Sequence, residues 1–199
     1  MQFKSAIMGV ALLAFCAGAA NADGSNWLGL NAGVGMPSGN YGDAASTGWN
    51  FGVTGTHMLN EQWGVGGDVG YHMWNASKDL QAATEAAFGP GSEFKWSAIQ
   101  ATAHAMLRMP TSSSVKPYAQ VGLGLYSLTG SLNSPAGDVS TSKSKLGYNF
   151  GLGADLMTSG NMKYGVTGAY HMIPAEKDFG SDVNEFSFAL NAQWGVGGK

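Results

Sequence analysis

Charged side chains are scarce in this sequence, and their scarcity limits what the surface of the protein can face. Asp, Glu, Lys and Arg make up 12% of the 199 residues, which is about half the share usual in soluble globular domains. The formal net charge is -3, and the Lys and Arg residues do not form the basic clusters that nucleic-acid binding requires. The composition therefore argues against nucleic acid as a partner. It also leaves few charges to cover a water-exposed surface.

Cysteine is nearly absent as well, because Cys16 is the only one. It lies in an apolar stretch from Ala6 to Gly18, which follows a positively charged start and precedes a small-residue cleavage site at 20–22. This order predicts a cleavable secretory signal peptide over residues 1–22. The stretch is too short for a membrane-spanning helix. We expect residues 23–199 to form one domain without disulfides.

The sequence is rich instead in a strict alternation of apolar residues with small or polar ones. In the last segment the apolar positions are Phe186, Phe188, Leu190, Ala192, Trp194 and Val196. A period of two places all of them on one face of a β-strand. The same pattern predicts eight strands, over about Trp27–Met36, Gly48–Met58, Trp63–Trp74, Phe94–Met109, Val115–Leu128, Lys145–Met157, Met162–Ile173 and Glu185–Val196.

The connections between these strands alternate in length. Short turns are expected at 59–62, 110–114 and 158–161, and long loops at 37–47, 75–93, 129–144 and 174–184. In an antiparallel meander this puts all short turns at one end and all long loops at the other, an asymmetry typical of outer-membrane barrels. A sheet in lipid must also close on itself, because hydrocarbon satisfies no backbone hydrogen bond. We therefore predict an all-β fold, an eight-stranded antiparallel up-and-down transmembrane β-barrel, integral in the outer membrane after export through the periplasm.

Aromatic residues concentrate near the predicted strand ends, where the membrane interface favours rings with one polar edge. The predicted aromatic girdle comprises Trp27, Trp49, Trp63, Tyr118, Tyr164 and Trp194. Mid-strand outward positions are mostly Val, Leu and Ala. This placement predicts outer-membrane lipids as the surroundings of the barrel.

Three segments resemble the small outer-membrane β-barrels of Gram-negative bacteria, the group of OmpX-like, OmpW-like and opacity-type proteins and the OmpA membrane domain. They are Gly33–Gly39, Pro117–Gly124 and the aromatic-alternating last strand. The resemblance implies the barrel fold, the outer membrane and the barrel-assembly machinery as a partner. Barrels of this group often end on an aromatic residue that the machinery reads. Here Trp194 or Val196 would take that place, followed by 197–199.

The inward positions predict a polar network inside the barrel. Its expected members are Asp68, Gln100, Arg108, Asp155, Lys163, His171 and Glu185. If the turn at 158–161 centres on Ser159, Asp155 and Lys163 face each other and form an ion-pair plug with Arg108, since a buried charge must be paired.

Two further contacts are expected within the same network. Asp68 is expected to meet Gln100 or Thr102 across the ladder. His171, opposite Glu185, is expected to form a hydrogen-bonded pair with it. Two interpretations of the network stay open, a structural polar network and a path for protons or ions.

Histidine placement bears on metal binding and catalysis. His72, His104 and His171 fall on the inward face, but at different depths or on distant strands, which disfavours a shared metal site. None of them has a serine two residues later, and a hydrolase needs a nucleophile or activated water beside its base. We expect no metal, no cofactor and no enzymatic activity, although a lipid-modifying enzyme is a third hypothesis.

Two functional hypotheses from different classes remain. In the first, the barrel has a structural or adhesin-like role, and its four long loops face outside to contact host or other extracellular surface molecules. In the alternative, the barrel is a narrow channel for small or hydrophobic solutes, as in OmpW-like porins. The many inward glycines permit a narrow wet channel, and they equally suit the tight curvature and packing of a small barrel.

Overall fold

The computed structural model describes residues 25–157 and 161–196. The predicted signal peptide, most of the predicted 158–161 turn and the end of the chain therefore lie outside the described residues. The elements in chain order are β1 (Asn26–Ser38), α2 (Asn40–Ala44), β2 (Gly48–Met58), β3 (Trp63–Asn75), α3 (Lys78–Phe88), β4 (Glu93–Arg108), β5 (Val115–Asn133), β6 (Val139–Met157), β7 (Met162–Ile173), α4 (Glu176–Phe179) and β8 (Val183–Val196).

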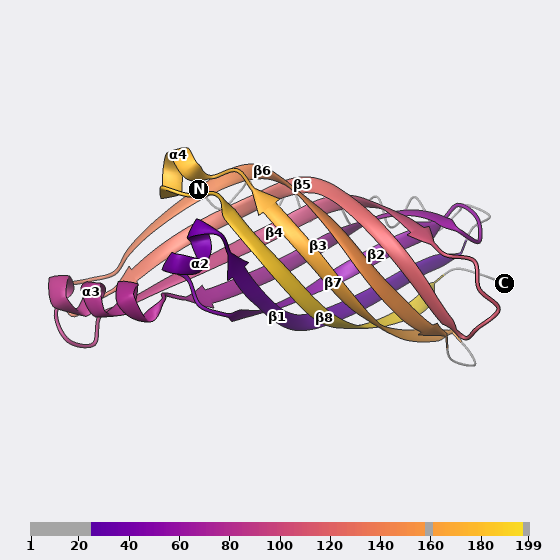
Figure 1. The fold of residues 1–199 in the computed structure, drawn as a ribbon, viewed down its shortest axis with the longest axis horizontal. Coiled ribbons are helices and arrows are strands. Elements are labelled where there is room, and N and C mark those ends of the chain that lie inside the picture. The colour runs from indigo at the N-terminus through magenta and orange to yellow at the C-terminus, as the bar shows by residue number, and fades with distance from the viewer. Residues whose placement is uncertain (1–24, 158–160, 197–199) are drawn as a thin grey trace.

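The strands close into one barrel (Figure 1). Each strand pairs antiparallel with the next along the chain, and β8 pairs antiparallel with β1. The predicted eight-stranded up-and-down barrel is thus confirmed for the described residues. No helix within 25–157 and 161–196 has the length and apolar character needed to cross a membrane.

The two faces of the sheet differ as the alternation predicts. Apolar side chains on the outer face are exposed, with Leu190 at 70% and Leu152 at 64%. Polar and charged side chains point inward, where Thr102 is 1% exposed and Asp155 is fully buried. A soluble monomer does not expose so continuous an apolar surface. This outer face therefore fits lipid, as expected.

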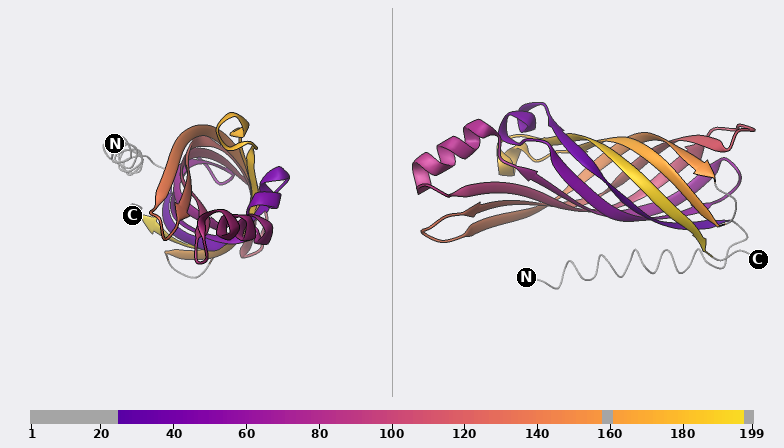
Figure 2. Two further views of the ribbon diagram at one scale, coloured as in Figure 1. Left: turned by 90° about the vertical axis from the view of Figure 1, so that its left-hand side faces the viewer. Right: turned by 90° about the horizontal axis from the view of Figure 1, so that it is seen from below.

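The long connections gather at one end of the barrel, where α2, α3 and α4 lie (Figures 1 and 2). In α3, the Ser77 hydroxyl caps the first turn by accepting a hydrogen bond from Leu80 N at 3.3 Å. Gly89, with φ 98°, ends the helix in a conformation that favours glycine. We call this end the long-loop end, and the opposite one the short-turn end.

One predicted loop is largely strand. The sequence pattern predicts a connection over residues 129–144, but β5 continues to Asn133 and β6 begins at Val139, with Leu132 paired to Val139. The extensions are rich in Ser and Thr and project past the apolar zone. Because both faces of the ribbon meet water there, the apolar alternation disappears while the backbone ladder continues.

Candidate functional site

An apolar cluster fills the barrel at the long-loop end. Tyr41, carried inward by α2, packs edge-on against Trp74 and Trp96 with ring centroids 5.6 and 5.9 Å away. The buried members of the cluster are Tyr41, Ala45, Trp74, Ala98, Tyr126, Leu128, Ile173, Ala175 and Val183. Burial, with Glu185 nearby, raises the pKa of the Tyr41 phenol well above its usual range, so this hydroxyl stays neutral. The side chains of this apolar cluster thus close the long-loop mouth of the barrel, and we call the cluster the plug.

Glu185 joins the plug to the polar interior. Its carboxylate is 2% exposed and accepts a hydrogen bond from Trp74 Nε1 at 3.0 Å. His72 Nδ1 lies 2.6 Å from its other oxygen. The expected hydrogen bond between His171 and Glu185 is wrong, although the two residues are register partners. The reason is that two side chains of β3, Trp74 and His72, extend across the lumen and bind both oxygens of the carboxylate.

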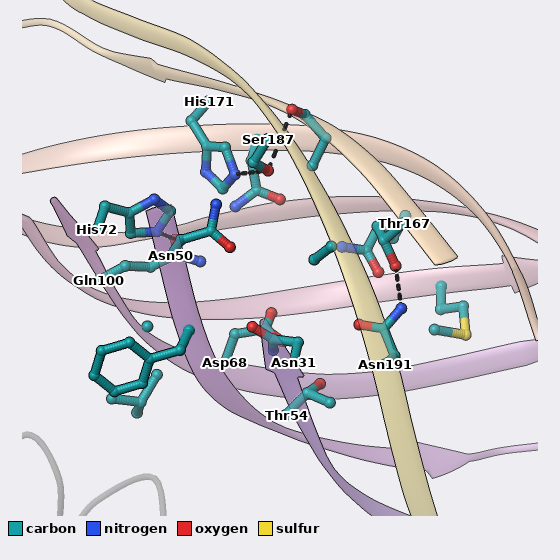
Figure 3. Close-up of a pocket in the computed structure, with 18 of the residues that line it drawn as sticks. Asn31, Asn50, Thr54, Asp68, His72, Gln100, Thr167, His171, Ser187 and Asn191 are labelled. Atoms are coloured by element: carbon teal, nitrogen blue, oxygen red, sulfur yellow. Dashed lines mark hydrogen bonds between the residues drawn. The ribbon is translucent and has the colours of Figure 1, made fainter. Parts of the chain in front are cut away.

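From His72 a chain of hydrogen bonds continues down β3 and β4. His72 Nε2 lies 2.9 Å from Gln100 Oε1, and Gln100 Nε2 donates to the Thr102 hydroxyl at 3.1 Å. Thr102 in turn donates to Asp68 at 3.4 Å, and the Asp68 carboxylate lies 2.7 Å from His104 Nδ1. Figure 3 shows His72, Gln100 and Asp68 converging on the lumen. Asp68 thus meets Thr102 and His104.

His171 lies beside this chain and has its own two hydrogen-bonding partners. Its Nδ1 lies 3.0 Å from the Tyr126 hydroxyl and its Nε2 3.0 Å from the Ser187 hydroxyl. Its ring lies 5.3 Å from that of His72, so these two histidines meet across the lumen although they come from the distant strands β7 and β3. Even so, the described residues contain no group of three His, Cys, Asp or Glu side chains arranged to hold a metal ion.

A second charged group lies at the short-turn end. Lys163 Nζ contacts Asp155 Oδ2 at 2.6 Å, and Arg108 Nη2 lies 3.7 Å from the same oxygen. The three predicted members therefore come together, but the expected pairing is shifted by two residues. Asp155 pairs with Gly165 across the ladder, so Lys163 reaches it diagonally. The Lys163 ammonium also sits 4.7 Å from the centre of the Trp27 ring.

The structure places the six predicted girdle aromatics on both faces. Trp49, Trp63, Tyr164 and Trp194 are on the outer face and 38–49% exposed. Trp27 and Tyr118 do not belong to a girdle, because Trp27 lies under Lys163 and Tyr118 is 2% exposed with its hydroxyl on Thr167. Both residues stand at positions of their strands that alternate toward the lumen. The prediction of a girdle counted aromatic residues near strand ends and did not separate inward from outward positions.

Interior glycines make room for these inward rings. A Cβ on Gly147 would lie 2.7 Å from Tyr126 Cδ2, and Gly153 similarly faces Tyr118, its register partner. The remaining interior cavity has a volume of about 80 Å³ and is lined largely by polar side chains, among them Asn50, Gln120 and Asn191. Gly147 and Gly153 thus leave space that inward aromatic side chains fill.

Outside the closed barrel, β6 carries an unpaired edge. Its ladder with β7 begins at the Tyr148–Met172 pair, whereas its ladder with β5 extends to Val139. Residues 139–146 therefore have no ladder partner on the β7 side within the described chain. We call this segment the β6 edge.

A neighbouring loop touches the side chains of the β6 edge. Asp178 of α4 contacts Lys145 directly, and its other oxygen lies 3.8 Å from Lys143 Nζ. The Lys145 hydrogen bond holds the pKa of Asp178 below its usual range. The loop around α4 is therefore held against the β6 edge by one carboxylate and two ammonium groups.

A closed sheet with an apolar exterior and an internally paired polar interior defines an integral membrane β-barrel. The chain belongs to the outer membrane protein beta-barrel domain family, whose profile matches residues 8–195. It is accordingly an integral protein of the outer membrane.

Solved structures share this fold at low sequence identity. Neisserial surface protein A matches with a TM-score of 0.56 and 20% identity, over 87% of this chain and 97% of that one. Ail, the attachment invasion locus protein of Yersinia pestis, solved with the heparin analogue sucrose octasulfate, gives a TM-score of 0.55 and 14% identity over 87% and 100%. A major outer membrane protein from Thermus thermophilus gives 0.50 and 14% over 86% and 99%. No curated protein sequence matches the chain.

Proposed function

We propose that the protein is a surface-interaction barrel with an adhesin-like role. Its long loops and the β6 edge face the cell exterior, and outer-membrane lipids surround the strands. The barrel-assembly machinery inserts it. The observation that carries the proposal is the contrast between a filled lumen and an unpaired strand edge outside it.

The filled lumen argues against solute passage. The plug closes one mouth, the Asp155–Lys163–Arg108 group narrows the other end, and a cavity of about 80 Å³ remains between them. Each lumen carboxylate has a basic partner close by, so the carboxylates there are already paired within the barrel. A channel would require the plug to move. Planar-bilayer recordings of refolded protein should therefore show no stepwise conductance, and steady conductance would favour the channel alternative.

The β6 edge supplies what strand addition needs. Met109 N donates to Pro117 O at 2.8 Å, so the backbone of Pro117 in β5 faces β4. Because backbone groups alternate in direction along a strand, the odd-numbered residues of β5 face β4 and the even-numbered residues face β6. The register then points the N–H groups of Ser140, Ser142 and Ser144 to the unpaired side. An extended segment of another molecule can pair with them, as in other complexes formed by strand addition.

Charge makes a sulfated glycan an unsuitable ligand here, although Ail was solved with a heparin analogue. The long-loop end has more carboxylates than ammonium groups. Five lysines (Lys78, Lys95, Lys143, Lys145 and Lys177) stand against eight acids (Asp43, Asp79, Glu85, Glu93, Asp138, Glu176, Asp178 and Asp182). A densely sulfated glycan spanning this end would meet these carboxylates as well as the lysines, so we favour a protein partner, whose charges can be confined to one short segment.

Ser142→Pro tests the proposal directly. Proline removes the N–H that faces the unpaired side and leaves the β5–β6 ladder intact. Bacteria expressing this variant should lose most attachment to cultured epithelial cells and to immobilised matrix proteins, whereas Ser142→Ala should attach like the parent. Equal attachment by both variants, at equal surface abundance, would refute the role of the edge.

A further inference from the structure

The contact between α4 and the β6 edge resembles a charge pair between neighbouring strands, except that its acidic partner comes from a helix and not from a strand. Lys143 and Lys145 are two residues apart and so project from the same face of the ribbon. A partner strand pairing with this edge would place its own side chains next to them. That position is now taken by Asp178, from a four-residue helix that lies beside the edge (Figure 1).

One carboxylate only partly neutralises the two lysines. The contact to Lys145 is close, but Lys143 Nζ stays 3.8 Å from Asp178, and the Lys143 side chain is 53% exposed. Asp178 itself is 27% exposed, and a rotation of its side chain alone would free the lysines while Phe179 of the same helix keeps its contact with Trp96. The edge thus retains positive charge toward any strand that approaches it.

This charge also decides which kind of segment fits. A second copy pairing edge to edge would bring its own Lys143 and Lys145 toward the same lysines, and like charges on neighbouring strands oppose pairing. An extended segment with carboxylates on one face would place them beside Lys143 and Lys145. Opposite charges in neighbouring strand positions stabilise such a pair.

We propose that the β6 edge accepts an extended acidic peptide segment, and that Asp178 is a latch that this segment displaces. The inference rests on the proposed function, since it names the partner class and the regulation of the same edge. The latch engages Lys145 closely and Lys143 loosely until a segment offering more than one carboxylate replaces it.

Binding of two labelled octapeptides to the full-length mature protein in nanodiscs tests the latch. The peptides alternate Thr with Glu or Thr with Lys, and fluorescence anisotropy reports binding. We expect the Thr-Glu peptide to bind the parent and to bind Asp178→Asn about tenfold more tightly. The Lys143→Gln/Lys145→Gln variant should bind it at least tenfold more weakly than the parent. Unchanged affinity in Asp178→Asn, or equal binding of the Thr-Lys peptide, would overturn the inference.

Two controls separate the possible failures. Heat-modifiable migration in detergent gels verifies that each variant is folded, and Glu176→Gln changes a carboxylate of the same helix outside the latch, so its peptide affinity should match the parent. If Ser142→Pro cells attach normally, the proposed function fails and the latch falls with it. If they lose attachment while Asp178→Asn binds the Thr-Glu peptide like the parent, the edge binds a partner but the acidic-latch inference alone is wrong. Dimerisation through the edge, seen by light scattering, would likewise overturn it.

Discussion

Separating the buried partners Asp155 and Lys163 should destabilise the barrel strongly. Both residues are at most 1% exposed, and their charged atoms lie 2.6 Å apart. In Asp155→Asn, Lys163 and Arg108 face each other without the carboxylate between them. In Lys163→Met, Asp155 keeps only the looser contact to Arg108 at 3.7 Å.

The expected magnitude follows from the burial of the pair. Removing one partner of a buried ion pair costs about 3–5 kcal/mol, because the other charge stays uncompensated. We expect each single variant to lose about 3 kcal/mol, since an amide at position 155 still accepts a hydrogen bond and Arg108 still faces the carboxylate. The double variant Asp155→Asn/Lys163→Met removes both charges and should lose far less than the sum, with a coupling of roughly 2–3 kcal/mol.

Urea unfolding of protein refolded in phospholipid bilayers, followed by tryptophan fluorescence, measures these losses. Glu93→Gln is the matched control, because Glu93 and Lys95 are also 2.6 Å apart but 53% and 41% exposed. An exposed pair contributes less than about 1 kcal/mol. Additive single variants, with a coupling below about 0.5 kcal/mol, would refute the view that burial makes this pair structural.

Three further outcomes are expected. A Cβ on Gly33 would lie 2.6 Å from the backbone atom Ala189 Cα, whereas a Cβ on Gly168 would lie 3.3 Å from a ring carbon of Phe188, which has room to shift. Urea unfolding should therefore show that Gly33→Ala loses about 1–3 kcal/mol of stability and that Gly168→Ala loses little. Because the pKa of Asp178 is lowered, its contribution to the stability of the α4 loop is present above the usual carboxyl pKa and is lost as pH falls through the lowered value. Amide hydrogen exchange at 174–182, corrected for the pH dependence of the intrinsic exchange rate, should therefore stay constant from about pH 7 to 5 and rise in stronger acid. A membrane-impermeant maleimide should label Ser134→Cys and spare Ser112→Cys on intact cells, and the reverse pattern would invert the proposed orientation.

The strands could be predicted because lipid imposes a simple rule on one face. Wherever the outer face meets hydrocarbon, every second residue must be apolar, and rows such as Leu146, Tyr148, Phe150 and Leu152 follow this rule. The rule stops where the ribbon leaves the membrane. Ser, Thr and Lys at 140–145 pair as strand while showing no apolar alternation, so the sequence pattern suggested a loop.

The polar interior was harder to predict, because alternation tells which face a residue occupies but not what it meets across the lumen. Trp74 and Glu185 are 111 positions apart on β3 and β8, and their contact depends on the shear of the closed barrel. The Asp155–Lys163 contact was within reach of sequence reasoning, since one turn joins their strands. Its register was not, because a shift of one residue in the turn centre leaves the strand patterns looking the same.

The carboxylates of the lumen are paired with basic side chains inside the barrel, which favours a binding function outside the lumen. Glu185 is matched by His72, Asp68 by His104 and Asp155 by Lys163, so the carboxylates of the interior already have partners. The β6 edge has no strand partner on one side of its backbone within the described chain. Changes in the lumen should therefore lower stability at unchanged attachment per folded molecule, while Ser142→Pro should lower attachment at nearly unchanged stability. A lumen variant that folds normally yet loses attachment would contradict this division.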